Sequence, residues 1–390
     1  MLPRRRRILE RGLSLFAITL LAILCSPVIL TLAGNHIQLT ENRESSPRPR
    51  LKDGWQIASN FGSYIKDRLS LRSTAVEIDS WIDVHVFGED PAFGGSSSPR
   101  VISGGDDFLF LADAIDVACA PNLEPSLTGP RLAAVMSAIS GSGRKVASLV
   151  APDKSTIFPD LLPKNLVKQE CFDAYTRNLW KSIESSSVDG YIDVRKALLA
   201  AKEENFDPLY LRRDSHWDNS GSLVAVREII KSLDSSLWDD EEVKREGTLS
   251  YVGDLTSLRG RPEPDTAPKI VISRPGVREI LNETLPSKGA PESRHIQNAS
   301  TQARLIKGKT LMFGDSFGFA ALDQLKPFFE DLKFIRIADF DSSYFATLVN
   351  TSDFVIVESV ERSLGYRMAM EFGSEKFVNY LHQALVPLNR

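Results

Sequence analysis

Two short motifs carry residues of the types that perform acyl transfer. One is Asp214-Ser-His216-Trp217, which places a carboxylate two residues before an imidazole. The other is Gly314-Asp-Ser316-Phe317, which places a serine hydroxyl directly after an apolar run. A carboxylate can fix the tautomer of a histidine, whose second ring nitrogen then accepts the proton of a serine. We therefore predict Ser316 as nucleophile, His216 as its base and Asp214 as the acid that orients the base.

The elements around Ser316 suit an exposed nucleophile. The run 310–313 predicts a strand, and a helix is expected from about Phe319. Gly314 would let the backbone turn sharply, and the amides at the helix start would point toward an oxyanion beside Ser316. The alternative is that Asp315 or Ser316 only caps the helix.

The elements around His216 are also a strand and a helix. Residues 209–211 form a short apolar run, and a helix is expected from about Ser220. In an extended or turning backbone, residues i and i+2 project to the same side, so Asp214 can reach the His216 ring. The alternative is a solvated loop histidine beside an ordinary helix cap at Asn219 or Ser220.

From residue 132 onward, helical periodicity alternates with short apolar runs. This alternation predicts an α/β fold, a parallel sheet flanked by helices, whose active site gathers at the carboxyl ends of the strands. The expected strands are residues 145–151, 310–313, 334–338 and 354–357. Residues 100–111 predict two further short strands around a Gly-Gly-Asp-Asp turn.

The N-terminus predicts a membrane signal. A tail rich in arginine, residues 1–12, precedes an apolar stretch at residues 13–34. That stretch is long enough to span a bilayer as an uncleaved transmembrane anchor. The basic tail should stay in the cytoplasm, and the rest should lie outside it. A cleaved signal peptide is the competing interpretation.

The rest of the chain divides into two parts. Residues 35–99 are expected to form a Pro- and Arg-rich linker and a helical extension, and residues 100–390 the catalytic domain. Six prolines between residues 237 and 304 are expected to interrupt any long element there, which suggests an insertion or lid.

Composition excludes some classes of partner and cofactor. A net charge of −4, with both signs spread along the chain, gives no basic footprint for nucleic acid. The five scattered histidines and the absence of a CxxC or HxxxH motif predict no metal, and we expect no cofactor. Cys25 lies in the apolar stretch. Cys119 and Cys171 can form a disulfide in an oxidising compartment, or remain two free thiols.

The two motifs resemble those of the alginate O-acetyltransferase family of the AlgJ and AlgX type, whose fold is SGNH-hydrolase-like, or flavodoxin-like. Its D-x-H-W motif corresponds to Asp214-Ser-His216-Trp217, and its late G-D-S-F motif to Gly314-Asp-Ser316-Phe317. Weaker parallels extend over residues 41–390. The sequence departs from the family at Asp107, where Gly is usual, and at Phe108, where Trp is usual.

The resemblance implies transfer of an acetyl group, through an acetyl-serine, to hydroxyls of an exported or cell-surface polysaccharide. The donor would be presented by a membrane-bound O-acyltransferase. The protein would be a single-pass protein of the cytoplasmic (inner) membrane with a periplasmic or extracellular catalytic domain. The alternatives are a carbohydrate esterase of the same fold and a non-catalytic polysaccharide-binding export component.

Four other residues are weaker candidates for substrate contact. Tyr344 could donate to the oxyanion, although tyrosine in such a turn is usually structural. Arg362 could contact acceptor hydroxyls or carboxylates, although a salt bridge to Glu358 is the simpler role. Trp217 could border the site and shield the histidine from water. Lys154 follows a strand, but the default for a lysine there is a solvated side chain.

Overall fold

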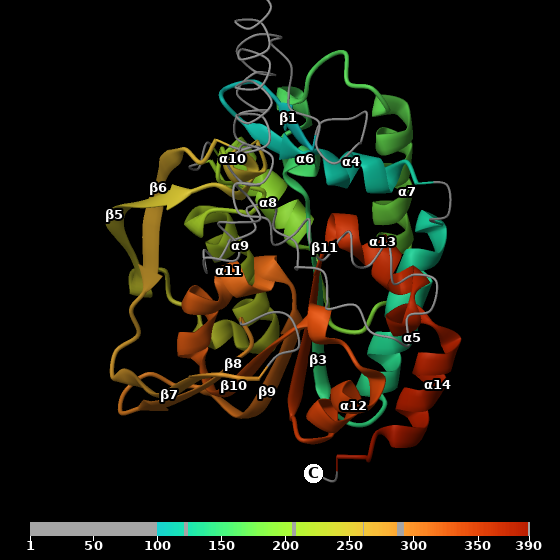
Figure 1. The fold of residues 1–390 in the computed structure, drawn as a ribbon. Coiled ribbons are helices and arrows are strands. Elements are labelled where there is room, and N and C mark those ends of the chain that lie inside the picture. Colours follow the sequence, from blue (N-terminus) through green and yellow to red (C-terminus); the bar gives the residue numbers. More distant parts are fainter. Residues whose placement is uncertain (1–99, 121–123, 205–207, 260, 287–291, 389–390) are drawn as a thin grey trace, which may run out of the picture. The chain divides into compact units, whose positions relative to one another are not determined.

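The computed structural model describes residues 100–390, except 121–123, 205–207, 260, 287–291 and 389–390 (Figure 1). The predicted tail, anchor and extension at residues 1–99 lie outside the described residues. Among the described residues, none of the helices has the length and apolarity needed to cross a membrane. The chain divides into two compact units, and residues 101–255 with 263–390 form the one that carries both motifs.

A seven-stranded sheet lies at the centre of this unit, with the order β4-β3-β11-β9-β10-β8-β7. Its strands are β3 (Lys145–Ala151), β4 (Tyr191–Ile192), β7 (Val277–Thr284), β8 (Arg294–Ser300), β9 (Ile306–Gly314), β10 (Phe329–Arg336) and β11 (Phe354–Val360). Two-stranded sheets pair β1 (Val101–Ser103) with β2 (Leu109–Leu111) and β5 (Val243–Val252) with β6 (Pro264–Ile272).

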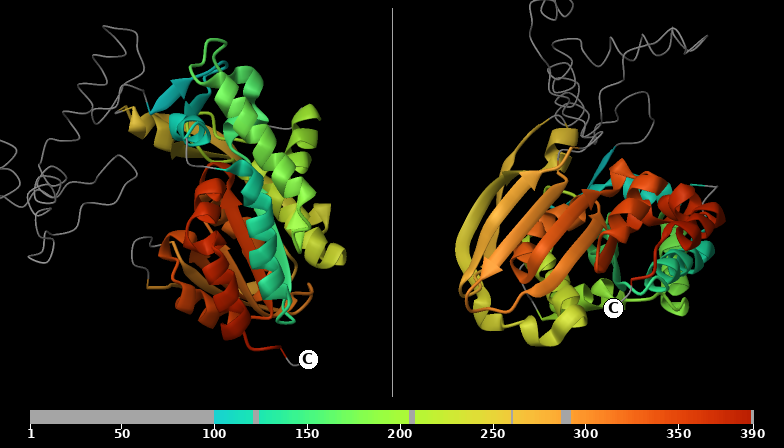
Figure 2. Two further views of the ribbon diagram at one scale, coloured as in Figure 1. Left: turned by 90° about the vertical axis from the view of Figure 1, so that its right-hand side faces the viewer. Right: turned by 90° about the horizontal axis from the view of Figure 1, so that it is seen from below.

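Helices cover both faces of the central sheet (Figures 1 and 2). The helices are α4 (Ala112–Ala118), α5 (Thr128–Ser140), α6 (Lys154–Ile157), α7 (Gln169–Ser185), α8 (Val194–Glu203), α9 (Asn219–Asp234), α10 (Asp254–Leu258), α11 (Ser316–Leu325), α12 (Ser342–Asn350), α13 (Glu361–Ala369) and α14 (Glu375–Ala384). Helix α9 packs on α8 and α11, whereas α5 packs on α7, α13 and α14. The predicted α/β class is confirmed.

The middle strands carry the core. In β11 all residues from 355 to 360 are buried, and in β3 all from 147 to 151. Strands covered on both faces have continuous apolar runs instead of alternation, which is why these segments were recognisable in the sequence. Strand β11 pairs in parallel with β3 and with β9, and β9 pairs in parallel with β10. Their carboxyl ends therefore meet at one edge.

The sheet is mixed, so the prediction of a parallel sheet holds only for β4, β3, β11, β9 and β10. Strands β8 and β7 extend it by antiparallel pairing. Both come from the Pro-rich stretch 237–304, in which no long element was expected. Pro264 is the first residue of β6, Pro268 lies in the two-stranded β5-β6 sheet, and Pro275 lies between strands. Proline is tolerated at strand starts and on edge strands because no ladder hydrogen bond is lost there.

The expected hairpin at residues 100–111 is present, since β1 and β2 pair antiparallel. Asp107, where the resembling family has Gly, has a left-handed backbone with φ of 60°. Aspartate tolerates this conformation better than most residues, which accounts for the exchange. Phe108, where that family has Trp, is buried in the core.

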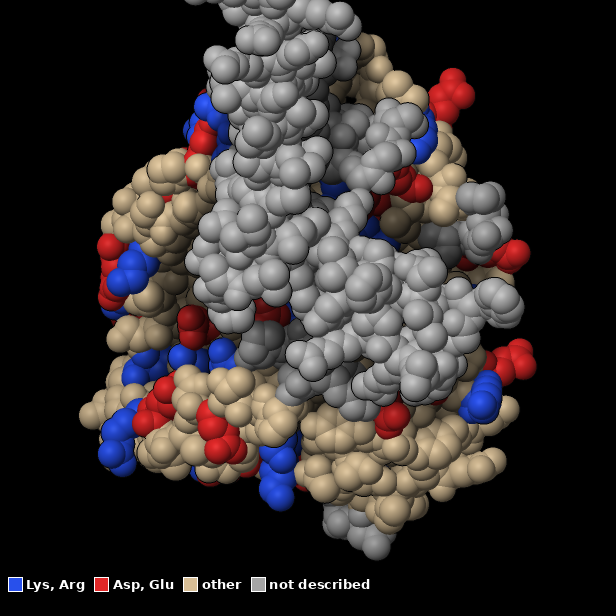
Figure 3. Space-filling view, in the orientation of Figure 1, with Lys and Arg blue, Asp and Glu red and all other residues tan. Residues whose placement is uncertain are grey.

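Charged side chains of both signs are interspersed on the described surface that Figure 3 shows.

Candidate functional site

Ser316 lies at the carboxyl edge of the central sheet. Strand β9 ends at Gly314, and α11 begins with Ser316. Asp315 is the helix cap, because its carboxylate accepts a hydrogen bond from the Phe317 amide at 3.0 Å. The cap alternative and the nucleophile prediction are thus compatible, since Asp315 performs the capping and leaves the Ser316 side chain available.

Asp214 and His216 form the expected pair. Asp214 Oδ1 lies 2.7 Å from His216 Nδ1 and accepts a hydrogen bond from the His216 amide at 2.9 Å. An isolated bridge between Tyr210 and Trp217 closes the loop, and Asp218 then caps α9. The loop therefore turns back on itself and keeps both side chains on one side.

The charge state of the pair is set by its surroundings. Burial favours the neutral acid, but hydrogen bonds from His216 and from the Asp254 amide hold the pKa of Asp214 at about 2. Because Asp214 is then ionised, Nδ1 of His216 must carry the proton that the bond requires. The neutral ring therefore has its free lone pair on Nε2, the nitrogen that a base needs.

His216 Nε2 is buried and has no hydrogen-bond partner among the described residues. The imidazole packs against the ring of Phe317, the residue after Ser316, with a centroid distance of 5.0 Å. The two motifs, 100 residues apart in the chain, thus meet at the same edge of the sheet. No hydrogen bond joins Nε2 to Ser316 Oγ in the described part of the chain, and the ring of His216 contacts the serine motif through the ring of Phe317.

A second carboxylate supports the pair, and sequence reasoning missed it. The Asp254 amide donates to Asp214 Oδ2 at 2.9 Å, and Asp254 Oδ2 lies 3.9 Å from His216 Nδ1. Asp254 also accepts hydrogen bonds from the amide and hydroxyl of Ser215, at 2.7 and 2.5 Å. It comes from a segment 40 residues away, and no local pattern marks it.

The two acids act on the same ring. Burial alone would lower the pKa of His216, but the hydrogen bond and charge of Asp214, with the charge of Asp254, raise it above its ordinary value. Burial and the neighbouring Asp214 charge also raise the pKa of Asp254. Both carboxylates therefore stabilise the imidazolium that forms when His216 takes a proton.

These three side chains could also suggest a metal site. Within the described ranges, Asp214, His216 and Asp254 offer ligand atoms that all lie within 4.8 Å of one another. The carboxylate oxygens, however, already accept hydrogen bonds from His216, Ser215 and the Asp254 amide. Hydrogen bonds among its own residues and Ser215 therefore hold the cluster together.

Lys154 is buried, so the expectation of a solvated lysine is wrong. Its ammonium donates to the carbonyl oxygens of Leu109, Leu211, Arg212 and Asp214. Burial lowers the pKa of Lys154 to about 7, against the pull of the Asp214 charge. Three of the four carbonyls belong to the loop that carries Asp214, so Lys154 fixes that loop to the sheet.

The backbone amides near Ser316 are mostly occupied, contrary to the expectation that they form the oxyanion site. The amides of Asp315 and Gly318 donate to Glu358 Oε2, at 2.9 and 3.1 Å, and the Phe317 amide donates to Asp315. From 315 to 319, the amide of Ser316 alone has no partner among the described residues. It is the backbone donor that an oxyanion beside Ser316 could use.

The weaker candidates occupy different environments. Trp217 is 2% exposed and packs against Phe317, so it presents almost no surface to a sugar. Arg362 pairs with Asp153 and not with Glu358, and its guanidinium lies 5.3 Å from the centre of the Phe317 ring. Tyr344 is exposed in the first turn of α12.

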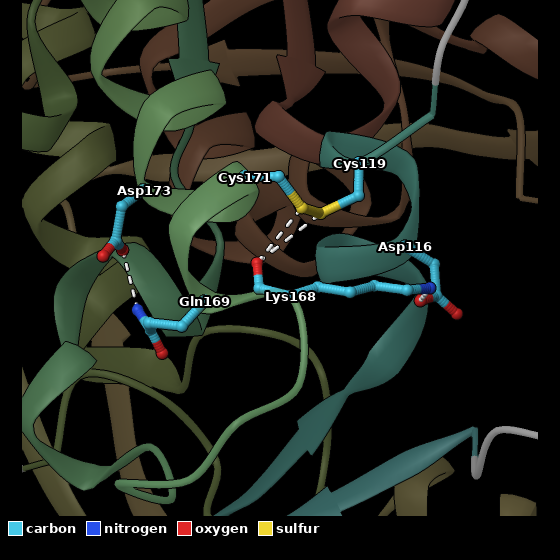
Figure 4. The surroundings of a disulfide bond; sticks show 6 residues. All are labelled: Asp116, Cys119, Lys168, Gln169, Cys171 and Asp173. Atoms are coloured by element: carbon cyan, nitrogen blue, oxygen red, sulfur yellow. Dashed lines mark hydrogen bonds and ion pairs between the residues drawn. A yellow bond between two sulfur atoms is a disulfide. The ribbon is translucent and has the colours of Figure 1, made fainter.

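Cys119 and Cys171 are joined by a disulfide, which decides between the two alternatives left by the sequence (Figure 4). The bond links the end of α4 to the first turn of α7. The Lys168 ammonium also contacts Asp116 in the same region, at 2.6 Å.

Comparison with known proteins gives one family match. Residues 101–277 match the family described as SGNH hydrolase-like domain, acetyltransferase AlgX. The matched range includes Asp214, His216 and Asp254 and ends before Ser316. No curated protein matches the chain.

Three solved structures are similar to this chain. The O-acetyltransferase domain of Pseudomonas putida AlgJ is 16% identical with a TM-score of 0.48, covering 73% of this chain and 100% of that one. Bacillus cereus PatB1 with a sulfonyl adduct is 11% identical with a TM-score of 0.48, covering 70% and 99%. Pseudomonas aeruginosa AlgX is 14% identical with a TM-score of 0.44, covering 73% and 65%.

Proposed function

We propose that this chain is a serine-dependent O-acetyltransferase, because residues 101–277 match the family of AlgX-type SGNH hydrolase-like acetyltransferase domains. Ser316 is its nucleophile, His216 its base and Asp214 the acid that orients the base. The observation that carries the proposal is the buried Nε2 of His216, which has no partner among the residues that the structure describes and whose ring packs on Phe317, the residue after Ser316. Nucleophilic acyl transfer needs a histidine whose Nδ1 donates to a carboxylate and whose Nε2 can accept the proton of a serine.

The reaction has two steps. In the first, His216 takes the Ser316 proton while Oγ bonds to the acetyl carbon; the bond from that carbon to the donor's leaving group then breaks, and the leaving group departs with the proton from His216. In the second, His216 takes the proton of an acceptor hydroxyl, whose oxygen bonds to the acetyl carbon. The bond to Ser316 then breaks, and Oγ regains a proton. The Ser316 amide donates to the oxyanion in each tetrahedral intermediate.

The acceptor that we propose is a hydroxyl of an exported or cell-surface polysaccharide. The family description and the chemistry of the site support acetyl as the transferred group. We further propose that residues 13–34 anchor the chain in the cytoplasmic membrane and that a membrane-bound O-acyltransferase presents the donor. Tyr344 and Arg362 remain proposed acceptor contacts, whereas the burial of Trp217 favours a packing role.

Paired assays test the proposal. Purified protein is given 4-nitrophenyl acetate with and without a panel of oligosaccharides, and both free acetate and acetylated sugar are measured. We expect acetylated sugar from the wild type and a loss of at least about 1,000-fold in Ser316→Ala. Ser343→Ala, which alters a serine in the first turn of another helix, α12, is the matched control and should keep full activity.

Two outcomes count against the proposal. Unchanged activity in Ser316→Ala would remove the nucleophile. Release of acetate with no sugar product at saturating acceptor would favour the esterase alternative, which uses the same residues.

A further inference from the structure

Glu358 lies beneath the turn that carries Ser316. It comes from β11, the strand next to β9, and its side chain is fully buried. Its Oε2 atom accepts hydrogen bonds from the amides of Asp315 and Gly318, at 2.9 and 3.1 Å. A carboxyl group from another strand therefore holds the backbone on both sides of the nucleophile.

The same carboxyl explains the two glycines of the motif. A Cβ atom at Gly314 would lie 2.8 Å from Glu358 Oε2, and one at Gly318 would lie at the same distance. Neither glycine is among the described residues with positive φ. Space for the Glu358 carboxyl, and not backbone freedom, is therefore what these positions need, which corrects the reason first given for Gly314.

The contact is more than a helix cap. Asp315 already caps α11 through the Phe317 amide, and its other oxygen binds the Val360 amide and the Arg367 guanidinium, each at 2.8 Å. Glu358 adds a tie from the first turn of the helix to the neighbouring strand. With Glu358 and Asp315 holding three amides, the Ser316 amide stays available.

Burial, and then the neighbouring Asp315 charge, raise the pKa of Glu358 well above its ordinary value. Oε1 of Glu358 has no partner among the described residues. A glutamine could therefore replace it, with its carbonyl accepting from the two amides and its amino group lying where Oε1 lies now.

We propose that Glu358 is a positioning residue for acyl transfer. It holds the turn so that the Ser316 hydroxyl faces His216 and the Ser316 amide is left for the oxyanion. The proposal rests on the proposed function, because it assigns Glu358 to the same nucleophile.

The test compares Glu358→Gln, which keeps an acceptor, with Glu358→Leu, which removes it at similar size. The rate of Ser316 acetylation is measured from the burst of 4-nitrophenol released from 4-nitrophenyl acetate. We expect Glu358→Gln to stay within about 5-fold of the wild type and Glu358→Leu to fall by about 100-fold, the cost of a misplaced reacting group. If Glu358→Gln is active and Glu358→Leu is not, the missing hydrogen-bond acceptor explains the loss of activity, and a change in the packing of residue 358 does not.

Two more variants complete the design. Asn298→Leu removes a different buried polar side chain: Asn298 lies in β8 and donates to the carbonyls of Lys326 and Phe329, away from the Ser316 turn. It should lower the melting temperature and leave the burst rate within about 3-fold. Gly314→Ala should slow the burst as Glu358→Leu does, because its new methyl group displaces the carboxyl. If Glu358→Leu fails to fold, the burst rate of Gly314→Ala takes its place in the test.

Amide hydrogen exchange gives a readout that does not depend on activity. The amide protons of Asp315 and Gly318 should exchange slowly in the wild type and in Glu358→Gln, and at least about 10-fold faster in Glu358→Leu. A wild-type burst rate in Glu358→Leu, or in Gly314→Ala where the former is unfolded, would overturn the proposal. A rate in Glu358→Gln as low as that in Glu358→Leu would also overturn it.

A failure of the proposed function has a different signature. In that case the wild type shows no burst at all, and the exchange rates alone decide the role of Glu358. Unchanged protection of the two amides in Glu358→Leu would then overturn it.

Discussion

At the scale of single residues, the reactivity of the site depends on the charges around one imidazole. Asp214 contacts Nδ1 of His216 directly, and Asp254 lies 3.9 Å from the same atom. Asp214 could be predicted because it stands two residues before His216. Asp254 could not, since its contact depends on the path of a distant loop.

The raised pKa of His216 sets the pH dependence. A base works in its neutral form, so activity is low below the pKa of His216 and rises as pH increases through it. Because that pKa lies above its ordinary value of 6.5, the rise should fall at higher pH than for a free histidine. Asp254→Asn removes a charge that raises the pKa, so the acidic limb of kcat/KM should move to lower pH.

The measurement is a pH profile of acetyl transfer for the wild type and the variant. Asp331→Asn is the matched control, because Asp331 lies 3.0 Å from a different histidine, His295, and should leave the limb in place. A limb that moves to higher pH in Asp254→Asn would contradict the assignment of Asp254.

At the scale of elements, the sequence predicted the strands that are buried on both faces and missed those built from polar or Pro-containing segments. Residues 311–313 of β9 and 354–357 of β11 are apolar, and β3 is apolar from 146 to 151 except at Ser148, so these strands were identifiable. Strand β7 is an edge strand and largely exposed, and β8 is only partly buried, so both have more polar side chains. The burial of Lys154 could not be predicted, because it depends on carbonyl oxygens that two other segments supply, one at Leu109 and one at residues 211–214.

Lys154 should be tested as the group that fixes the Asp214 loop. Lys154→Met leaves buried carbonyl oxygens without a donor, so the free energy of unfolding should fall by about 2 kcal/mol or more. Acetyl transfer should fall with it, because Asp214 loses its support. Urea denaturation and the transfer assay check this, with exposed Lys164→Met as the control. Unchanged stability of Lys154→Met would contradict the buried contacts.

The disulfide should stabilise the contact between α4 and α7. It joins residues 52 apart, and the loop entropy removed from the unfolded chain corresponds to about 4 kcal/mol. Adding dithiothreitol should therefore lower the denaturation midpoint of the wild type. A Cys119→Ser, Cys171→Ser double variant should already have the lower midpoint and show no response to reductant. An equal response in both proteins would contradict the bond.

At the scale of the whole molecule, the order of motifs and the edge of the sheet together determine the site. Alternating elements predicted that strands end at one edge, and the two motifs do meet there, on β9 and before α9. The sequence could not show that Glu358 holds the Ser316 turn or that Lys154 holds the Asp214 loop, because these contacts join segments far apart in the chain.

The proposed anchor at residues 13–34 gives a prediction for the full-length protein. The chain should remain in the membrane pellet after carbonate extraction, and protease added outside the cytoplasmic membrane should degrade its catalytic domain. N-terminal sequencing should give a chain that begins at or near residue 1. Release by carbonate, or a new N-terminus after the apolar stretch, would favour the cleaved signal peptide.

The most direct test of the central claim is mass spectrometry of the protein quenched during turnover of 4-nitrophenyl acetate. We predict one acetyl group on the peptide that contains Ser316, none on that peptide in Ser316→Ala, and a strongly reduced amount in His216→Ala. Turnover by the wild type with the acetyl group on another residue, or continued turnover by Ser316→Ala, would contradict the account.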